Sequence, residues 1–436
     1  MFQSFERFIN FEKKTDLLKR SYRLDRMDFM LKSFGNPQNQ YQTLHVAGSK
    51  GKGSTATYLA AALEGLGYVT GLYTSPHLED YRERVTLGGR FFPDFLYLET
   101  VKEVNTFVEE ALVQGLFAPW GGDPTTFELL TLTAFLIFAR AGVQWAVIEV
   151  GLGGRLDATN LILPKACIIT PLELEHTDVL GDTLAMIARE KAGILKPNTP
   201  YLSAPQPPEA QKMIELRSQE LGCPALLPPL QIYSQVQLEL DTKGTRIRGQ
   251  DPQGRNLNFT LQNVGEVMGI NALTALALLT QMGFISGPSE VEKVQKALEK
   301  VHLRGRMEAL KSFVPVYLDG AHTPASVQSV FKTFSTLFSG PRTVLFGAAE
   351  GKSTAEMAAI LKPHFHNILI VRPGTFKSSN LVDLAQAFGG EGPGLRVIPE
   401  AEEALEFALL AGLPTLVVGS FYLAAEVAKA ARKMGL

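Results

Sequence analysis

The sequence predicts an α/β protein with two doubly wound domains, residues 1–300 and residues 301–436. Apolar runs of strand length alternate with helical patterns along most of the chain. Glycine-rich turns follow several of these runs, as expected where parallel strands lead into helices. The alternation starts again after residue 300, which places the domain boundary there.

Composition limits the classes of partner. Apolar residues make up 45% of the chain and charged residues 20%, as in ordinary globular proteins. The net charge of −2 gives no case for a nucleic-acid partner. No apolar run has the length of a membrane span, the N-terminus lacks the apolar core of a signal peptide, and two cysteines cannot form a disulfide framework. We therefore expect a cytoplasmic protein without a membrane or nucleic-acid partner.

Residues 1–35 are predicted to be helical and amphipathic. Apolar residues recur there at three- and four-residue spacing, namely Leu17, Leu18, Leu24, Met27, Met30 and Leu31. Core packing is their expected role.

A short buried strand begins at Leu44 and leads into a glycine-rich loop and then a helix over residues 56–66. In such a loop the backbone N–H groups can point at phosphate oxygens, and the helix N-terminus adds partial positive charge. Lys52 can neutralise the β- and γ-phosphates, and Ser54 or Thr55 can hold Mg²⁺.

The spacing departs from the general P-loop pattern, because Val46 stands where that pattern has glycine and Gly53 where it has serine or threonine. The strand–loop–helix context nevertheless favours nucleotide binding. A glycine-rich turn with a surface lysine is the alternative.

Three polar residues are expected near the carboxyl ends of predicted strands. His77 follows a strand that begins near residue 68, Glu149 lies within the apolar strand 144–150, and His176 follows the strand 166–170. Carboxyl ends of parallel strands form the ligand edge of an open sheet. A carboxylate, an imidazole and a hydroxyl there suit Mg²⁺ bridging phosphates. A capped turn for His77 and a structural ion pair for Glu149 are the alternatives.

Helices are predicted over residues 94–113 and from Thr125 to Arg140. Thr125 or Thr126 is a plausible N-cap of the second helix, and Glu128 suits its first turn. Capping accounts for these residue types without a role in binding.

Downstream, the pattern predicts a helix over residues 183–195 and, because residues 231–261 alternate apolar and polar, a small antiparallel satellite sheet. Helices over 268–282 and 289–300 follow, and residues 304–308 are interpreted as an interdomain linker.

The C-terminal domain has four predicted strands, residues 316–319, 343–347, 367–371 and 415–419. Residues 347–354 look like a second P-loop, but the first glycine is one residue too close. A turn that places Ser353 near a helix start is the favoured interpretation.

Together these motifs resemble the folylpolyglutamate synthase/dihydrofolate synthase family of the Mur-ligase superfamily. Residues 45–55 are similar to its HVAGTNGKGST stretch, including the glycine after the lysine, and residues 149–160 match EVGLGGRLDATN almost letter for letter. Shorter matches occur in order at residues 74–78, 191–194, 305–306, 319–322 and 419–423.

The resemblance implies a ligase that uses ATP to join the amino group of L-glutamate to a pteroate or folate carboxylate through an acyl phosphate. It implies an N-terminal P-loop domain, a C-terminal Rossmann-like domain and a site in the cleft. The implied cofactors are ATP, two Mg²⁺ ions and a carbamylated Lys191, with K⁺ or another monovalent cation as a further candidate. The implied partners are small molecules, and the chain is expected to be a monomer.

The resemblance also assigns roles to individual residues. The catalytic residues would be Lys52, His176 and Lys191. ATP would contact Gly48, Ser49, Lys50, Gly51, Lys52, Gly53, Ser54, Thr55, Asn271, Arg306, Asp319 and His322. The metal ligands would be Ser54, Glu149, His176 and carbamylated Lys191. The substrate would contact Ser75, His77, Thr125, Phe127 and Asp157.

Four residues depart from the family pattern: Lys50 for asparagine, Glu175 for aspartate, Arg304 for proline and Thr323 for asparagine. The first two change the charge near the expected metals. Two alternatives stay open, a Mur-type ligase for another carboxylate acceptor such as a cell-wall nucleotide precursor, and an ATP-binding interaction protein without ligase activity. The motifs do not separate dihydrofolate synthase from folylpolyglutamate synthase or from a bifunctional enzyme.

Overall fold

The computed structural model describes residues 2–7, 24–374 and 378–436, and the chain divides into two compact units. The second unit is made of residues 237–247, 260–269 and 302–436, and the first unit holds the other described residues. The first two of these segments lie within the N-terminal domain predicted from the sequence, residues 1–300. Leu240 shows why they cluster with the second unit, because it packs against that unit's hydrophobic core.

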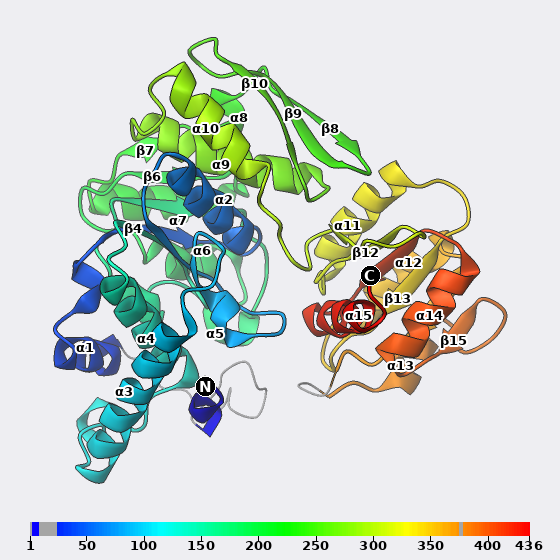
Figure 1. The fold of residues 1–436 in the computed structure, drawn as a ribbon, viewed down its shortest axis with the longest axis horizontal. Coiled ribbons are helices and arrows are strands. Elements are labelled where there is room, and N and C mark those ends of the chain that lie inside the picture. Colours follow the sequence, from blue (N-terminus) through cyan, green and yellow to red (C-terminus); the bar gives the residue numbers. More distant parts are fainter. Residues whose placement is uncertain (1, 8–23, 375–377) are drawn as a thin grey trace. The chain divides into compact units, whose positions relative to one another are not determined.

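The first unit is built on a seven-stranded sheet with the order β3-β2-β4-β1-β5-β6-β7. Figure 1 labels β4, β6 and β7 of this sheet. Its strands are β1 (Gln42–Ala47), β2 (Thr70–Tyr73), β3 (Val85–Leu87), β4 (Trp145–Glu149), β5 (Ala166–Ile169), β6 (Tyr201–Ser203) and β7 (Ala225–Leu226). All neighbours are parallel except β2 and β3. The apolar runs become the buried central strands β1, β4 and β5, whose carboxyl ends therefore share one edge.

Ten helices precede the second unit's main segment in the described chain. They are α1 (Leu24–Ser33), α2 (Lys52–Gly65), α3 (Asp94–Val113), α4 (Thr126–Arg140), α5 (Thr177–Leu180), α6 (Leu184–Ala192), α7 (Pro208–Glu220), α8 (Pro229–Ile232), α9 (Glu266–Gln281) and α10 (Pro288–Leu298). Of the predicted N-terminal helical region, the structure describes a 3₁₀ turn (Phe2–Arg7) and α1, which buries Met27, Met30 and Leu31. Leu17 and Leu18 lie outside the described residues.

The small satellite sheet has the order β10-β9-β8. Its strands are β8 (Gln237–Asp241), β9 (Gly244–Gln250) and β10 (Asn256–Leu261). The prediction that the sheet region begins at residue 231 is wrong for Ile232, which is the last residue of α8. Pro229 is the first residue of that helix, where proline's fixed φ and missing N–H are compatible with a helix start.

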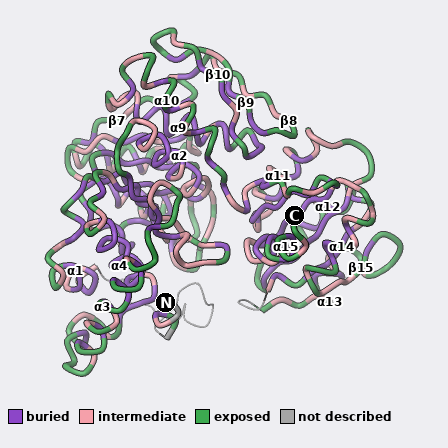
Figure 2. Tube along the Cα trace, in the orientation of Figure 1, coloured by how far each residue is buried: buried purple, intermediate pink, exposed green. Residues whose placement is uncertain are grey.

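The second unit has a six-stranded sheet with the order β11-β12-β16-β13-β14-β15. Its strands are β11 (Glu308–Ala309), β12 (Val316–Leu318), β13 (Thr343–Phe346), β14 (Asn367–Ile370), β15 (Leu395–Val397) and β16 (Thr415–Val418). Its helices are α11 (Pro324–Leu337), α12 (Thr354–Leu361), α13 (Leu381–Ala387), α14 (Ala401–Ala411) and α15 (Phe421–Lys433). The expected α/β class is confirmed, and Figure 2 shows buried residues along the inner strands of each unit.

The predicted linker, residues 304–308, lies inside the second unit. Glu308 pairs with Leu318 in the antiparallel β11–β12 ladder, and the Gly305 carbonyl accepts a hydrogen bond of 2.9 Å from Gly320 N. These backbone bonds fix the segment to the sheet edge. No helix of the described residues is long and apolar enough to cross a bilayer.

Candidate active site

The loop between β1 and α2 needs glycine at two positions. Gly48 has φ +146°, and a Cβ there would overlap the Thr170 hydroxyl. Gly51 has φ +85°, and its Cβ would lie 2.6 Å from Asn271 Oδ1. The Nδ2 of Asn271 is buried without a hydrogen-bond partner among the described residues. An amide donor left free beside a glycine loop is suited to a ligand with acceptor oxygens.

Lys52 is the first residue of α2, and its side chain folds back over the loop. Its Nζ donates to the carbonyls of Gly48 at 2.9 Å and Ser49 at 3.3 Å. The backbone N–H groups of Ser49 and Lys50 donate to the Pro171 carbonyl at 3.0 and 3.1 Å, which ties the loop to the segment after β5. A bound phosphate would compete for the lysine at a helix N-terminus that already favours anions.

Glu149 ends β4 and is 3% exposed. Its Oε2 accepts a hydrogen bond of 2.9 Å from Ser75 N. A Cβ on Gly53 would lie 3.3 Å from the same oxygen, so the carboxylate faces the first turn of α2, where Ser54 is also buried. The predicted carboxylate thus faces the helical turn that carries the predicted hydroxyl ligand.

Lys191, near the end of α6, is brought to the same loop. Its side chain is 2% exposed, and its Nζ donates to the Gly48 carbonyl at 2.7 Å and to Glu175 Oε1 at 3.0 Å. Burial, followed by the charge of Lys52, lowers the pKa of Lys191 to about 8. Burial alone would raise the pKa of Glu175, but Lys52, Lys191 and the adjacent histidine together lower it to about 2.

His176 is exposed and precedes α5 with φ +48°, a backbone conformation that histidine adopts more readily than most residues. Within the described part of the chain, no three His, Cys, Asp or Glu side chains form a group that could hold a metal. The roles assigned to His176 as metal ligand and catalytic residue therefore stay predictions.

Two of the departures lie close to this loop. The Ser49 hydroxyl donates to the Glu173 carbonyl at 3.2 Å, so the segment that carries Glu173 and Glu175 contacts the loop. Burial raises the pKa of Glu173, against the opposing charge of Lys50. Lys50 thus has an acidic neighbour that offsets its charge.

The glycine-rich loop after β4 is organised by Asp157, which is 5% exposed. Its carboxylate accepts from Leu152 N at 2.9 Å, Thr159 N at 3.0 Å and Thr159 Oγ1 at 2.5 Å. Burial raises the pKa of Asp157, while these hydrogen bonds oppose the rise. A Cβ on Gly154 would lie 2.8 Å from the Glu190 carbonyl, which explains glycine where the loop packs on α6.

Thr125 and Phe127 lie at the start of α4. Thr125 caps the helix in a capping box with Glu128, as the sequence predicts. A Cβ on Gly151 would overlap the Phe127 ring, so this ring lies directly on the glycine-rich loop. The capping box does not exclude the role of Thr125 in binding, which stays a prediction.

Sequence reasoning missed Arg26. This residue is 2% exposed, and its guanidinium binds the Glu128 carboxylate with distances of 2.8–3.1 Å. The two residues are 102 positions apart, and no local pattern links them. The pair joins α1 to the capped start of α4.

His77, predicted to contact substrate, lies in the loop after β2. Its Nδ1 accepts a hydrogen bond of 2.8 Å from Arg84 Nε, and its ring lies 4.2 Å from that of Tyr81. The neutral histidine therefore carries its proton on Nε2.

In the second unit, Asp319 accepts hydrogen bonds from Met307 N at 2.9 Å and Ala321 N at 2.8 Å. The Arg306 guanidinium lies 4.9 Å from the centre of the Phe421 ring. His322 Nδ1 lies 2.8 Å from the Gly320 carbonyl. The nucleotide-binding roles of Arg306, Asp319 and His322 stay predictions.

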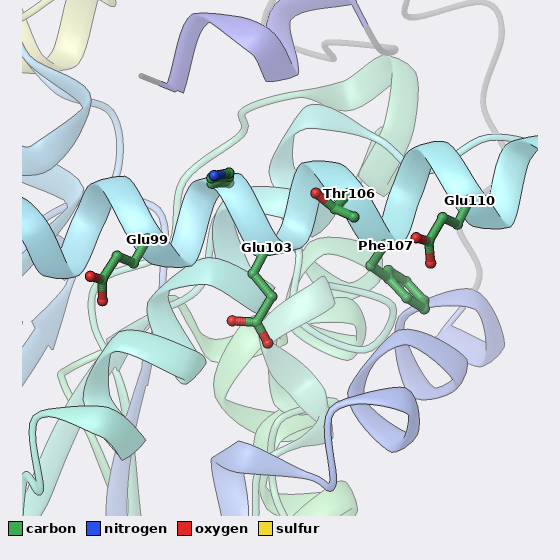
Figure 3. Close-up of a pocket in the computed structure, with 6 residues that line it drawn as sticks. Glu99, Glu103, Thr106, Phe107 and Glu110 are labelled. Atoms are coloured by element: carbon green, nitrogen blue, oxygen red, sulfur yellow. The ribbon is translucent and has the colours of Figure 1, made fainter.

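A shallow hollow lies on α3, away from all predicted site residues. Figure 3 shows Glu99, Glu103 and Glu110 on this helix around Phe107, and Lys102 and Thr106 complete the lining. A solvated acidic helix face accounts for it, and it plays no part in the predicted site.

Comparison with known proteins finds a family match in each half of the chain. Residues 46–279 match the Mur ligase middle domain, and residues 305–420 match the Mur ligase glutamate ligase domain. The chain is 31% identical over 404 residues to the folylpolyglutamate synthase of Lacticaseibacillus casei, covering 91% of this chain and 92% of that protein. It is 32% identical over 352 residues to the dihydrofolate synthase/folylpolyglutamate synthase of Bacillus subtilis, covering 79% and 80%. The crystal structure of Mycobacterium tuberculosis folylpolyglutamate synthase with ADP and AMPPCP aligns with a TM-score of 0.83 and 28% identity over 96% of each chain.

Proposed function

Because the chain belongs to the folylpolyglutamate synthase/dihydrofolate synthase family of Mur ligases, we propose that it is an ATP-dependent ligase that joins L-glutamate to a pteroate or folate. The observation that carries this proposal is the convergence of Lys52, Glu149 and Lys191 on the loop between β1 and α2. Such a group can hold a nucleoside triphosphate, with the lysine offsetting the phosphate charge and the carboxylate available to a metal ion.

The reaction would proceed in two steps. An oxygen of the acceptor carboxylate attacks the γ-phosphorus of ATP, ADP leaves, and an acyl phosphate forms. The glutamate amine then attacks the acyl carbon, and the tetrahedral intermediate collapses with loss of phosphate and of a proton from nitrogen. Lys52 and the N-terminus of α2 bind the phosphates in both steps, so the protein contributes mainly position and charge.

Mg²⁺ prefers oxygen ligands, and the Glu149 carboxylate and the Ser54 hydroxyl fit that preference at the start of α2. When bound there, the ion would offset phosphate charge. The ammonium form of Lys191 would repel a cation, whereas its carbamate would supply a further anionic oxygen. We therefore include a carbamylated Lys191 in the proposal. Its low pKa supports this, since only the neutral amine attacks CO₂.

A second metal held by His176, a monovalent cation such as K⁺, a monomeric chain and a cytoplasmic location also remain expectations from the family. The family also leads us to expect substrate contacts by Ser75, His77, Thr125, Phe127 and Asp157.

The test is ADP release by the purified protein with Mg-ATP and L-glutamate, comparing dihydropteroate with tetrahydrofolate as acceptor. Turnover with dihydropteroate alone identifies a dihydrofolate synthase, turnover with tetrahydrofolate alone a folylpolyglutamate synthase, and turnover with both a bifunctional enzyme. If the protein binds ATP but uses neither acceptor, the proposal is wrong about the substrate, and a different carboxylate acceptor or a non-catalytic role takes its place.

A further inference from the structure

A buried chain of hydrogen bonds ends on Asp157. It begins at His45 in the central strand β1, where the side chain is fully buried. His45 Nε2 lies 2.9 Å from Thr159 Oγ1, and Thr159 Oγ1 lies 2.5 Å from Asp157 Oδ1. The chain links the strand before the phosphate loop to the glycine-rich loop after β4.

The available donors and acceptors fix the direction of these hydrogen bonds, from His45 through Thr159 to Asp157. Burial raises the pKa of Asp157, but its carboxyl group already accepts from the backbone N–H groups of Leu152 and Thr159, and these hydrogen bonds stabilise the carboxylate form. The single hydroxyl proton of Thr159 is therefore donated to Asp157, and the hydroxyl oxygen accepts from His45 Nε2–H. Burial and the charge of Lys196 lower the pKa of His45 to about 3, so the imidazole is neutral.

The other ring nitrogen of His45, Nδ1, supports the same direction of hydrogen bonding. Nδ1 has no hydrogen-bond partner among the described residues. As a bare acceptor it is tolerated, but reversing the chain would place an N–H there with nothing to receive it. The imidazole is thus locked as a donor toward Thr159. An apolar residue at position 45 would fill the core without leaving any nitrogen unsatisfied, so packing alone does not explain a histidine there.

We propose that His45 and Thr159 are positioning residues that hold the Asp157 carboxylate as a pure hydrogen-bond acceptor for the heterocycle of the acceptor substrate. This inference rests on the proposed function and on the contact between Asp157 and that substrate that the family leads us to expect. The chemistry recognised is a fused pyrimidine-type ring that presents N–H donors. A ring with a carbonyl at the same place would meet a carboxylate oxygen and be rejected.

The test compares Thr159→Val, which removes the hydroxyl but keeps the shape, with Thr159→Ser, which keeps it. We expect Thr159→Val to raise KM for the pteroate or folate acceptor about tenfold, as for loss of a hydrogen bond to a charged group. The KM for ATP should stay within about twofold, and Thr159→Ser should restore most of the acceptor affinity.

A second, independent pair of variants changes His45. His45→Gln can place an N–H near the position of Nε2, whereas His45→Leu cannot. We expect His45→Leu to raise the KM for the acceptor but not for ATP, and His45→Gln to keep most of the acceptor affinity. Thr133→Val is the matched control, since Thr133 is also a fully buried threonine but donates only to the Leu129 carbonyl within α4. It should lose stability without changing acceptor KM.

An unchanged acceptor KM in both Thr159→Val and His45→Leu, with the wild type active, would overturn this inference and leave the proposed function standing. Equal increases in the KM for ATP and for the acceptor would also overturn it, because they indicate a purely structural role. An inactive wild type would instead overturn the proposed function and the inference with it.

Discussion

The low pKa of Lys191 leads to a measurable rate. With a pKa of about 8, about one Lys191 side chain in eleven is neutral at pH 7 and about half are neutral at pH 8. A lysine with the ordinary pKa of 10.5 is neutral about once in three thousand at pH 7, so the site raises the neutral, CO₂-reactive fraction of Lys191 by about 300-fold. At constant dissolved CO₂, the initial rate of carbamate formation should rise about fivefold from pH 7 to 8 and level off above pH 9.

The assay is ¹³C NMR of the protein in ¹³C-labelled bicarbonate, following the carbamate carbon. Lys191→Ala should abolish the signal. Lys196→Ala is the matched control, because burial also lowers the pKa of Lys196, and it should keep the signal. A signal that survives Lys191→Ala would refute the assignment. A rate that still rises tenfold per pH unit at pH 9 would show that the reacting lysine has an ordinary pKa.

Three further substitutions test other parts of the site. Lys52→Ala should lower ADP release at least about 100-fold, because it removes the charge that we propose binds the phosphates from the loop between β1 and α2. Arg26→Met should lower the free energy of unfolding in urea by about 3–5 kcal/mol, since it leaves the Glu128 carboxylate buried without its partner. Phe421→Leu should raise KM for ATP by about two- to fivefold, the loss expected for a cation–π contact that orients Arg306.

Each substitution has a matched control elsewhere in the chain. Lys352→Ala changes the lysine of the loop that only looks like a P-loop, and it should leave turnover intact. Lys32→Met breaks an exposed pair with Asp28 and should change stability by less than about 1 kcal/mol. Phe407→Leu removes an equivalent ring 4.9 Å from the Arg396 guanidinium and should not change KM for ATP. A control that behaves like its partner would contradict the corresponding role.

The sequence predicts the central elements well because their signals are local. The apolar run 144–150 becomes the buried strand β4, which ends at Glu149, and Thr125 caps α4 through a residue three positions away. β11 and β15 were missed because strands of two and three residues at a sheet edge carry too little apolar pattern.

Contacts between distant segments also cannot be predicted from local sequence patterns. The Arg26–Glu128 pair and the chain from His45 to Asp157 depend on packing that brings segments about a hundred residues apart together. The glycine at position 154 is conspicuous in the sequence, but its reason, the close Glu190 carbonyl, appears only in the folded chain. Motif matching located His45, Gly154 and Asp157 without supplying the contacts that explain them, and it did not point to Arg26.

The charges around the phosphate loop give the departures at Lys50 and Glu175 a common explanation. Before any ligand binds, Lys50, Lys52 and Lys191 are balanced by the carboxylates at positions 149, 173 and 175. Converting the Lys191 ammonium to a carbamate changes the local charge by two negative units, which one Mg²⁺ ion would restore. Glu175 would then lose the Lys191 ammonium as its partner and face a like charge, with Lys52 and His176 still close to it. Carbamate formation and metal binding are therefore expected to favour each other at this site, and the ammonium–Glu175 pair is the arrangement suited to the metal-free protein.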